Sequence, residues 1–129
     1  MKSAMMTPDL LPGVELATVF AERKCPELKG IKHAWCDECD AAHDQEPRQL
    51  SHTYHRPKTI CWARAITDQA VEHQIGICLH EYGHLLAGDC GSVVDDEAGA
   101  DLAVLNRMGV EIRYVGPHEL QTVELGDLS

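Results

Sequence analysis

Residues 71–88 read Val-Glu-His-Gln-Ile-Gly-Ile-Cys-Leu-His-Glu-Tyr-Gly-His-Leu-Leu-Ala-Gly, and this stretch is the most informative part of the chain. Its apolar residues recur three and four positions apart, which is the spacing of an amphipathic α-helix. Gly88 follows the last apolar positions, and glycine commonly ends a helix because it adopts a left-handed conformation at little cost. The stretch therefore predicts one long helix, and His80, Glu81 and His84 lie within it.

His80 and His84 are four residues apart on this predicted helix. Such positions project within about 40° of each other, so both imidazoles can bind one Zn²⁺. Glu81 lies between them, close enough to take a proton from a water bound to the metal. Catalytic zinc sites use three protein ligands and leave a fourth position open. A third ligand is therefore expected nearby.

Glu97 is the preferred third ligand. It lies 13 residues after His84, at the start of a second predicted helix at residues 97–108, which Gly109 ends. Two helices joined by a short turn pack antiparallel, so the second helix can direct a carboxylate toward the first. Asp101 lies one turn after Glu97 and can accept the free N–H of a ligating histidine.

Four residues between the two helices are alternative ligands or caps. Asp95 and Asp96 are expected to cap the second helix. Asp89 and Cys90 compete with Glu97 for the metal, and Cys90 stands six residues after His84, where metzincins place a third histidine. The metzincin pattern also requires glycine at position 87, where this chain has alanine. Glu97 therefore remains the expected ligand.

The whole chain predicts an α+β fold. The predicted elements are, in order, a helix at residues 12–24, a solvated polar segment or loop at 36–47, a strand at 59–66, the long helix capped by Thr67 or Asp68, the second helix at 97–108, a strand at 110–115 and a short helical or irregular tail. The second helix is expected to bury a stripe formed by Ala98, Leu102, Leu105 and Met108.

The two predicted helices together resemble a known group of enzymes. His80-Glu81-x-x-His84 followed by Glu97-Ala98-Gly99-Ala100-Asp101 is similar to the gluzincin metallopeptidases, including HtpX-like and prenyl-protein peptidases and small peptidases that cleave phage repressors. The resemblance covers residues 59–109. It implies that Glu81 is the general base, that Asp101 supports a ligand, and that extended substrates lie along an edge strand at residues 60–65.

The same resemblance implies a minimal zincin-like domain. We expect residues 1–129 to form one such domain, because the chain is too short for a second. Its metallopeptidase core is residues 59–109, and residues 25–58 are a polar segment that contains Cys and His. Gluzincins often place an oxyanion-stabilising donor downstream of the core. His118 is the preferred candidate for this catalytic role; the alternatives are Tyr114, Arg113, His52, Tyr54 and His55.

Cysteines gather in the polar segment, which includes the run His33-x-x-Cys36-x-x-Cys39-x-x-x-His43. Together with Cys25 and Cys61, the Cys-x-x-Cys pair could build a closed structural zinc site, a second metal site of the chain. The chain has no second Cys-x-x-Cys, and the spacing matches no standard zinc finger. Reduced thiols and a disulfide therefore stay open as alternatives.

Charge and composition narrow the classes of partner. The 129 residues include 11 Lys and Arg against 21 Asp and Glu, a formal net charge of −10. This charge argues against nucleic acid and anionic membranes as partners, because both are bound through basic side chains. No apolar run is long enough to span a bilayer, and the N-terminus lacks the apolar stretch of a signal peptide. A cytoplasmic protein is expected.

These observations favour a zinc metalloprotease that hydrolyses peptide or protein substrates with one catalytic Zn²⁺. The alternative is a zinc-stabilised protein-binding module with weak or no catalysis. The two hypotheses differ over Glu81, which hydrolysis requires and a binding module does not. A purely structural zinc site is normally closed by four protein ligands and needs no base, so Glu81 between the histidines favours the hydrolase.

Overall fold

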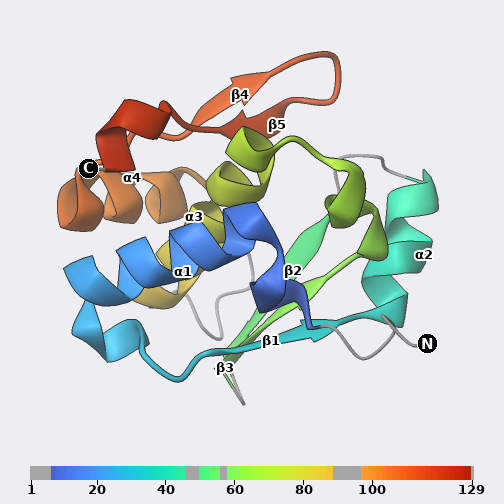
Figure 1. The fold of residues 1–129 in the computed structure, drawn as a ribbon, viewed down its shortest axis with the longest axis horizontal. Coiled ribbons are helices and arrows are strands. Elements are labelled where there is room, and N and C mark those ends of the chain that lie inside the picture. The colour runs from blue at the N-terminus through green and yellow to red at the C-terminus, as the bar shows by residue number, and fades with distance from the viewer. Residues whose placement is uncertain (1–6, 46–49, 56–57, 89–96, 129) are drawn as a thin grey trace.

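The computed structural model describes residues 7–45, 50–55, 58–88 and 97–128, and it confirms the expected α+β class (Figure 1). Within these residues the helices are α1 (Pro12–Lys24), α2 (Asp37–Gln45), α3 (Val71–Ala87) and α4 (Glu97–Met108). The strands are β1 (Lys32–Trp35), β2 (Ser51–His55), β3 (Lys58–Trp62), β4 (Arg113–Val115) and β5 (Leu120–Thr122). None of the helices described is both long and apolar enough to cross a membrane.

Three of the strands form a small mixed sheet in the order β1-β3-β2. β1 runs parallel to β3, whereas β2 runs antiparallel to it and pairs Ser51 with Trp62 and Thr53 with Ile60. Paired side chains lie on the same face of a sheet. The hydroxyls of Ser51 and Thr53 therefore share a face with the buried Ile60 and Trp62. β4 and β5 form a separate antiparallel hairpin.

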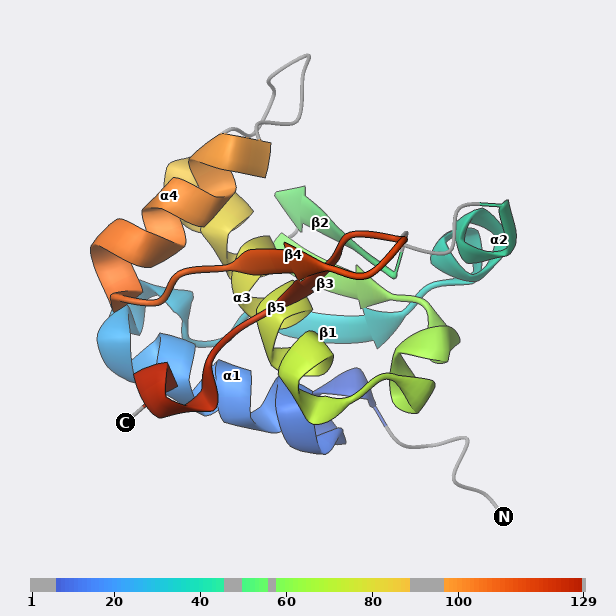
Figure 2. The ribbon, with the colours of Figure 1, turned by 90° about the horizontal axis from the view of Figure 1, so that it is seen from above.

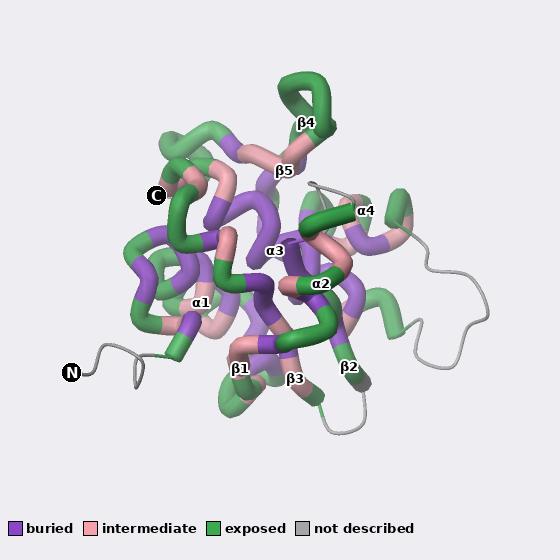
Figure 3. Tube along the Cα trace, turned by 90° about the vertical axis from the view of Figure 1, so that its right-hand side faces the viewer, coloured by how far each residue is buried: buried purple, intermediate pink, exposed green. Residues whose placement is uncertain are grey.

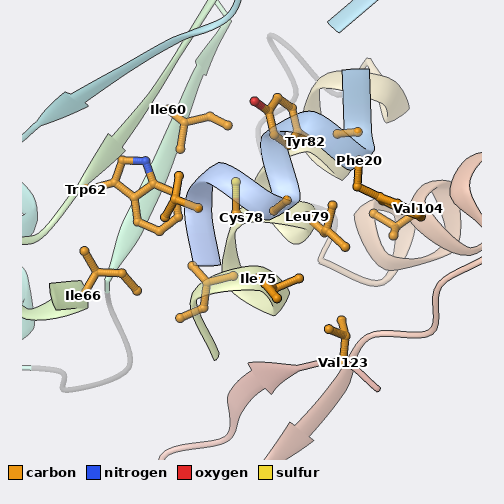
Figure 4. Close-up of a cluster of buried hydrophobic side chains, with 14 of the residues drawn as sticks. Phe20, Ile60, Trp62, Ile66, Ile75, Cys78, Leu79, Tyr82, Val104 and Val123 are labelled. Atoms are coloured by element: carbon orange, nitrogen blue, oxygen red, sulfur yellow. The ribbon is translucent and has the colours of Figure 1, made fainter. Parts of the chain in front are cut away.

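α3 is the centre of the molecule, as the continuous buried stretch in Figure 3 shows. Its residues from Gln74 to His84 are all buried, and α1, α4, β2 and β5 pack around it. Figure 4 shows Cys78 and Leu79 of this helix between Trp62 of β3 and Val104 of α4. Figure 2 shows the β4–β5 hairpin lying over α3, with α2 and α4 at opposite ends of the molecule.

Two glycines allow neighbouring elements to approach α3 closely. A Cβ atom at Gly76 would lie 2.6 Å from the backbone nitrogen of Thr122 in β5. A Cβ atom at Gly83 would collide with the backbone carbonyl of Ala100 in α4 and would lie 2.9 Å from Cγ2 of Val104. Both contacts are closer than side-chain carbons normally reach, so these two packings depend on glycine.

The three long helices form where the sequence predicts them, but only some of the residues predicted to begin or end them do so. α1, α3 and α4 confirm the three predicted helices. Gly88 ends α3 in the left-handed conformation, with a φ angle of 66°. The expected cap of α3 was wrong, because Thr67 and Asp68 belong to a 3-10 turn, η4 (Arg64–Asp68), and Ala70 occupies the N-cap position. Asp95 and Asp96, the expected caps of α4, lie outside the described residues.

Residues 36–47 were expected as a solvated segment or loop, but Asp37–Gln45 form α2. Three of the acidic residues, Asp37, Glu38 and Asp40, occupy the first turn of this helix. Negative charge is favourable there because the N-terminus of a helix carries partial positive charge. The acidic composition therefore predicted the solvent exposure of this segment correctly, but the prediction of a loop was wrong because the segment is a helix.

The predicted strands were displaced. The strand expected at residues 59–66 is β3, which ends at Trp62 and is followed by η4. The implied edge strand at residues 60–65 is wrong, because β3 is the central strand of the sheet and β2 is the edge strand that contacts α3. The strand expected at 110–115 is limited to Arg113–Val115, and the C-terminal tail contains the short strand β5 and a 3-10 turn, η5 (Leu125–Leu128).

α4 packs through a different stripe from the one expected. Leu102 and Leu105 are 56% and 46% exposed, whereas Ala100, Val104 and Met108 are buried. The reason is the close approach at Gly83, which docks α4 onto α3 along the line of Ala100 and Val104. Of the expected stripe, only Met108 is buried.

Candidate metal centre

His80 and His84 lie on consecutive turns of α3, and both are buried, with 1% and 7% of their area exposed. Glu97, the first residue of α4, reaches both of them. Nε2 of His80 lies 2.9 Å from Oε2 of Glu97, and Nε2 of His84 lies 3.0 Å from Oε1. One nitrogen or oxygen from each residue lies within 4.8 Å of the others. The structure therefore brings together the three residues predicted as metal ligands.

Asp101 lies against the opposite ring nitrogen of His80, one turn along α4 from Glu97. Its Oδ1 is 2.6 Å from Nδ1 of His80, and its Oδ2 accepts a hydrogen bond of 2.7 Å from the hydroxyl of Tyr114. When Nδ1 of a neutral His80 donates to Asp101, Nε2 keeps a lone pair for a metal. Asp101 thus selects the tautomer that a ligand needs, and Tyr114 holds Asp101.

The electrostatics of the cluster favour a bound cation. Burial alone would lower the pKa of His80, but hydrogen bonds with Asp101 and Glu97 outweigh burial and raise that pKa to about 10. Hydrogen bonds from His80 and His84 lower the pKa of Glu97 well below its usual range. Without a metal, a proton on His80 balances the two carboxylates. A metal ion would displace this proton, because histidine coordinates in its neutral form.

Glu81 is buried on the side of α3 that faces β2, with 6% of its area exposed. The hydroxyl of Ser51 donates a hydrogen bond of 2.7 Å to Oε2, and the hydroxyl of Thr53 donates to Oε1. The Thr53 hydroxyl also lies 3.2 Å from the main-chain oxygen of Glu81. Two hydroxyls on one edge strand therefore hold this carboxylate in a single orientation.

Sequence reasoning missed Ser51 and Thr53. The alternation of Ser51, His52, Thr53 and Tyr54 indicates a strand with two different faces. It does not say which face meets the histidine helix, because that depends on the pairing of β2 with β3, which the local sequence does not specify.

His118, the preferred oxyanion donor, is exposed in the turn between β4 and β5. Its catalytic role stays a prediction. Tyr114, one of its alternatives, is the downstream residue whose hydroxyl reaches Asp101 beside the cluster. Asp89 and Cys90, the rival ligands, lie outside the described residues.

The four cysteines proposed for a second metal site lie in two places. Cys25 follows the end of α1, remote from α2 (Figure 1), whereas Cys36, Cys39 and Cys61 lie where α2 meets β3. Among the described residues, His80, His84 and Glu97 are the only group of three with metal-binding spacing. The four thiols therefore do not assemble the predicted site, and the five cysteines in the described part of the chain are all free.

Comparison of the chain with protein-family models, with curated proteins and with solved structures gives no match. Function is therefore inferred from the site itself. Two histidines four apart on one helix and a glutamate on the next are consistent with a zincin-like metal site.

Proposed function

We propose that the chain is a zinc-dependent hydrolase of peptide bonds, built as a minimal gluzincin. The observation that carries the proposal is the convergence of His80, His84 and Glu97 to within 4.8 Å. Two imidazoles and one carboxylate are a donor set used by catalytic zinc, which keeps a further position for substrate or water. The exposure of the Glu97 side chain, 57%, supports access to that position from solvent.

Each residue of the cluster has a distinct role in this proposal. His80, His84 and Glu97 hold the ion, and the hydrogen bond from Nδ1–H of His80 to Asp101 leaves Nε2 as the nitrogen that faces the metal. Zn²⁺, when bound, supplies Lewis acidity that polarises a carbonyl and makes water nucleophilic at neutral pH. Glu81 accepts a proton from the attacking water and returns it to the nitrogen of the leaving amine.

An extended peptide is the substrate class that the surroundings of Glu81 favour. β2 is an edge strand, and no other strand among the described residues pairs with its outer edge. Peptides often bind by adding a strand to such an edge. A peptide paired with β2 would pass the backbone of Ser51 and Thr53, the two residues that hold Glu81.

Glu81→Gln tests the proposal. Glutamine has nearly the shape of glutamate but cannot accept the proton at neutral pH, so zinc content and fold should be kept while kcat falls by about 10²–10⁴-fold. Hydrolysis of casein and of a fluorogenic peptide library would be measured together with zinc content and circular dichroism. Glu72→Gln, an exposed change in the first turn of the same helix, is the matched control and should leave all three unchanged. Equal activity of wild type and Glu81→Gln would remove Glu81 from the mechanism.

A zinc-stabilised protein-binding module is the second candidate, and one observation favours it. Both carboxylate oxygens of Glu81 are already engaged by hydroxyls of β2, so the side chain is also explained as a link between helix and sheet. In that case Glu81→Gln would cost stability and leave no activity to lose. Inactivity of folded, zinc-loaded wild type on every substrate would favour this second function.

A further inference from the structure

Three thiols gather where β1 leads into α2. Cys36 lies between these two elements, and its backbone serves both of them. Its N–H donates to the carbonyl of Trp62 at 2.9 Å, which extends the pairing of β1 with β3. Its carbonyl accepts from the N–H of Asp40 at 3.1 Å, which begins the hydrogen bonding of α2. Cys36 is thus the residue just before the helix, and Cys39 lies in the first turn.

The sulfur of Cys36 is the centre of this group. It accepts a hydrogen bond of 3.4 Å from the backbone N–H of Cys39, and the side chains of Cys39 and Cys61 are both its hydrogen-bond partners. The thiol of Cys39 also lies 3.9 Å from the main-chain oxygen of Cys61. All three cysteines are free of disulfides in the structure. We refer to Cys36, Cys39 and Cys61 as the thiol cluster.

The three sulfurs of the thiol cluster differ in their surroundings. Cys36 stands just before α2, and its sulfur accepts the backbone N–H of Cys39 in the first turn of that helix. Burial, with a further contribution from the neighbouring Cys36, raises the pKa of Cys61 to about 11 and that of Cys39 still further. Cys39 and Cys61 therefore keep their protons at neutral pH. Cys36 is buried, with 8% of its area exposed, whereas Cys61 is half-buried.

We propose that Cys36 and Cys39 form a thiol–disulfide exchange site whose substrate is a low-molecular-weight disulfide such as oxidised glutathione. The Cys36 thiolate attacks one sulfur of that disulfide, forms a mixed disulfide and releases one glutathione thiolate, which takes up a proton. Cys39 then loses its proton and attacks the Cys36 sulfur, which releases the second glutathione as a thiol. The two protein thiols are oxidised to one disulfide while the small disulfide is reduced to two thiols.

The backbone selects Cys39 as the partner of Cys36. Residues three apart in a helical turn have Cα atoms about 5 Å apart, which is inside the range of about 4.4–6.8 Å that disulfides bridge. Cys61 of β3 pairs with Ala34 of β1, and Ala34 is two residues before Cys36. Cys36 and Cys61 are therefore diagonal neighbours across the two strands. Such diagonal neighbours are about 7–8 Å apart, beyond the range that a disulfide normally bridges.

The thiol cluster does not have the spacing of a metal site. Metal ligation by three sulfurs requires their convergence on one point. Within the part of the chain that the structure describes, the group of three with that spacing is His80, His84 and Glu97, and it includes no cysteine.

The test is disulfide mapping of the full zinc-treated chain after incubation with excess oxidised glutathione. Trypsin places Cys36 and Cys39 in one peptide, residues 33–48, and Cys61 in another, residues 59–64. The expected product is peptide 33–48 lacking two hydrogens, with Cys61 open to alkylation. A cross-link between the two peptides, or no loss of thiols, would overturn the proposal, and this readout needs no variant.

Variants then separate the two steps. Cys39→Ser should accumulate glutathione on Cys36, because the resolving thiol is missing, whereas Cys36→Ser should form neither the mixed disulfide nor the internal one. Cys78→Ser, which removes a buried thiol of α3 outside the thiol cluster, is the matched control and should oxidise like wild type. Glutathione on Cys61 in the Cys39→Ser protein, or a second equivalent of zinc that protects the thiols and is lost in Cys36→Ser, would refute the assignment.

Discussion

Replacing Gly83 with alanine should weaken metal binding, although residue 83 is not a ligand. The added Cβ atom would collide with the backbone carbonyl of Ala100 and would lie 2.9 Å from Cγ2 of Val104. A backbone carbonyl cannot rotate away as a flexible side chain does, so α4 has to move relative to α3. Glu97 begins α4 and would move with it, whereas His80 and His84 stay on α3.

Two effects on stability oppose each other in this variant. Alanine is favoured over glycine inside a helix by about 1 kcal/mol. Overpacking against a rigid neighbour costs about 1–3 kcal/mol. The difference between these figures is a net loss of about 0–2 kcal/mol in the free energy of unfolding. We expect the upper part of that range, because the neighbour is a backbone carbonyl. Ligand distances tolerate only about 0.2 Å of error, so a shift of α4 on the order of 0.5 Å should weaken zinc binding about tenfold or more.

Gly76→Ala is the control for this prediction, because it adds the same methyl group to the same helix. Its collision is with Thr122 of β5, so it should destabilise the fold. It can reach the metal centre only through Tyr114 of the paired strand β4, so zinc affinity should fall much less than in Gly83→Ala. Competition with a zinc chelator and urea unfolding would be measured for both variants. If Gly83→Ala binds zinc like wild type, the close approach of α4 does not set the ligand geometry. If it is also more stable than wild type, the collision itself is refuted.

Two further predictions concern a ligand and a buried histidine. Glu97→Ala should lose stoichiometric zinc while Cys90→Ser keeps it, as measured by elemental analysis after dialysis; the opposite order would make Cys90 the ligand. His33 accepts a hydrogen bond from Nε1 of Trp62 and contacts the hydroxyl of Tyr82, and burial lowers its pKa from 6.5 to about 4. The unfolded chain therefore binds a proton that the folded chain excludes. The contribution of His33 to the free energy of unfolding is fully present above pH 6.5 and falls toward pH 4, by about 2–3 kcal/mol near pH 4.5. Urea unfolding at several pH values measures this slope, and an equally steep slope in His33→Gln would contradict its origin.

The parts of the site that lie on one helix could be predicted because their geometry is local. The spacing of His80 and His84 on α3 needs only the 3.6-residue repeat, and Gly88 marks its end. Glu97 could be predicted because it begins the very next helix. Each of these inferences depends on residues within a few turns of one another.

The sheet side of the site could not be predicted in the same way. Ser51 and Thr53 contact Glu81 only because β2 pairs antiparallel with β3 and leaves β3 in the centre. Strand order depends on contacts between distant segments, which alternation along one strand does not specify. The buried stripe of α4 was missed for a related reason, because Gly83, a residue of another helix, determines which side of α4 docks.

The metal ligands and the contact between Glu81 and β2 also differ in how far apart their residues lie along the chain. His80 and Glu97 are 17 residues apart, whereas Glu81 and Ser51 are 30 apart and belong to a helix and a sheet. Contacts close in sequence form early in folding, and pairings between distant strands form late. A complete chain that refolds from denaturant would therefore bring its proposed metal ligands together before β2 orients the proposed base. If the proposed function is right, such a folding intermediate would bind zinc before it could hydrolyse a peptide, so metal loading would precede activity during refolding.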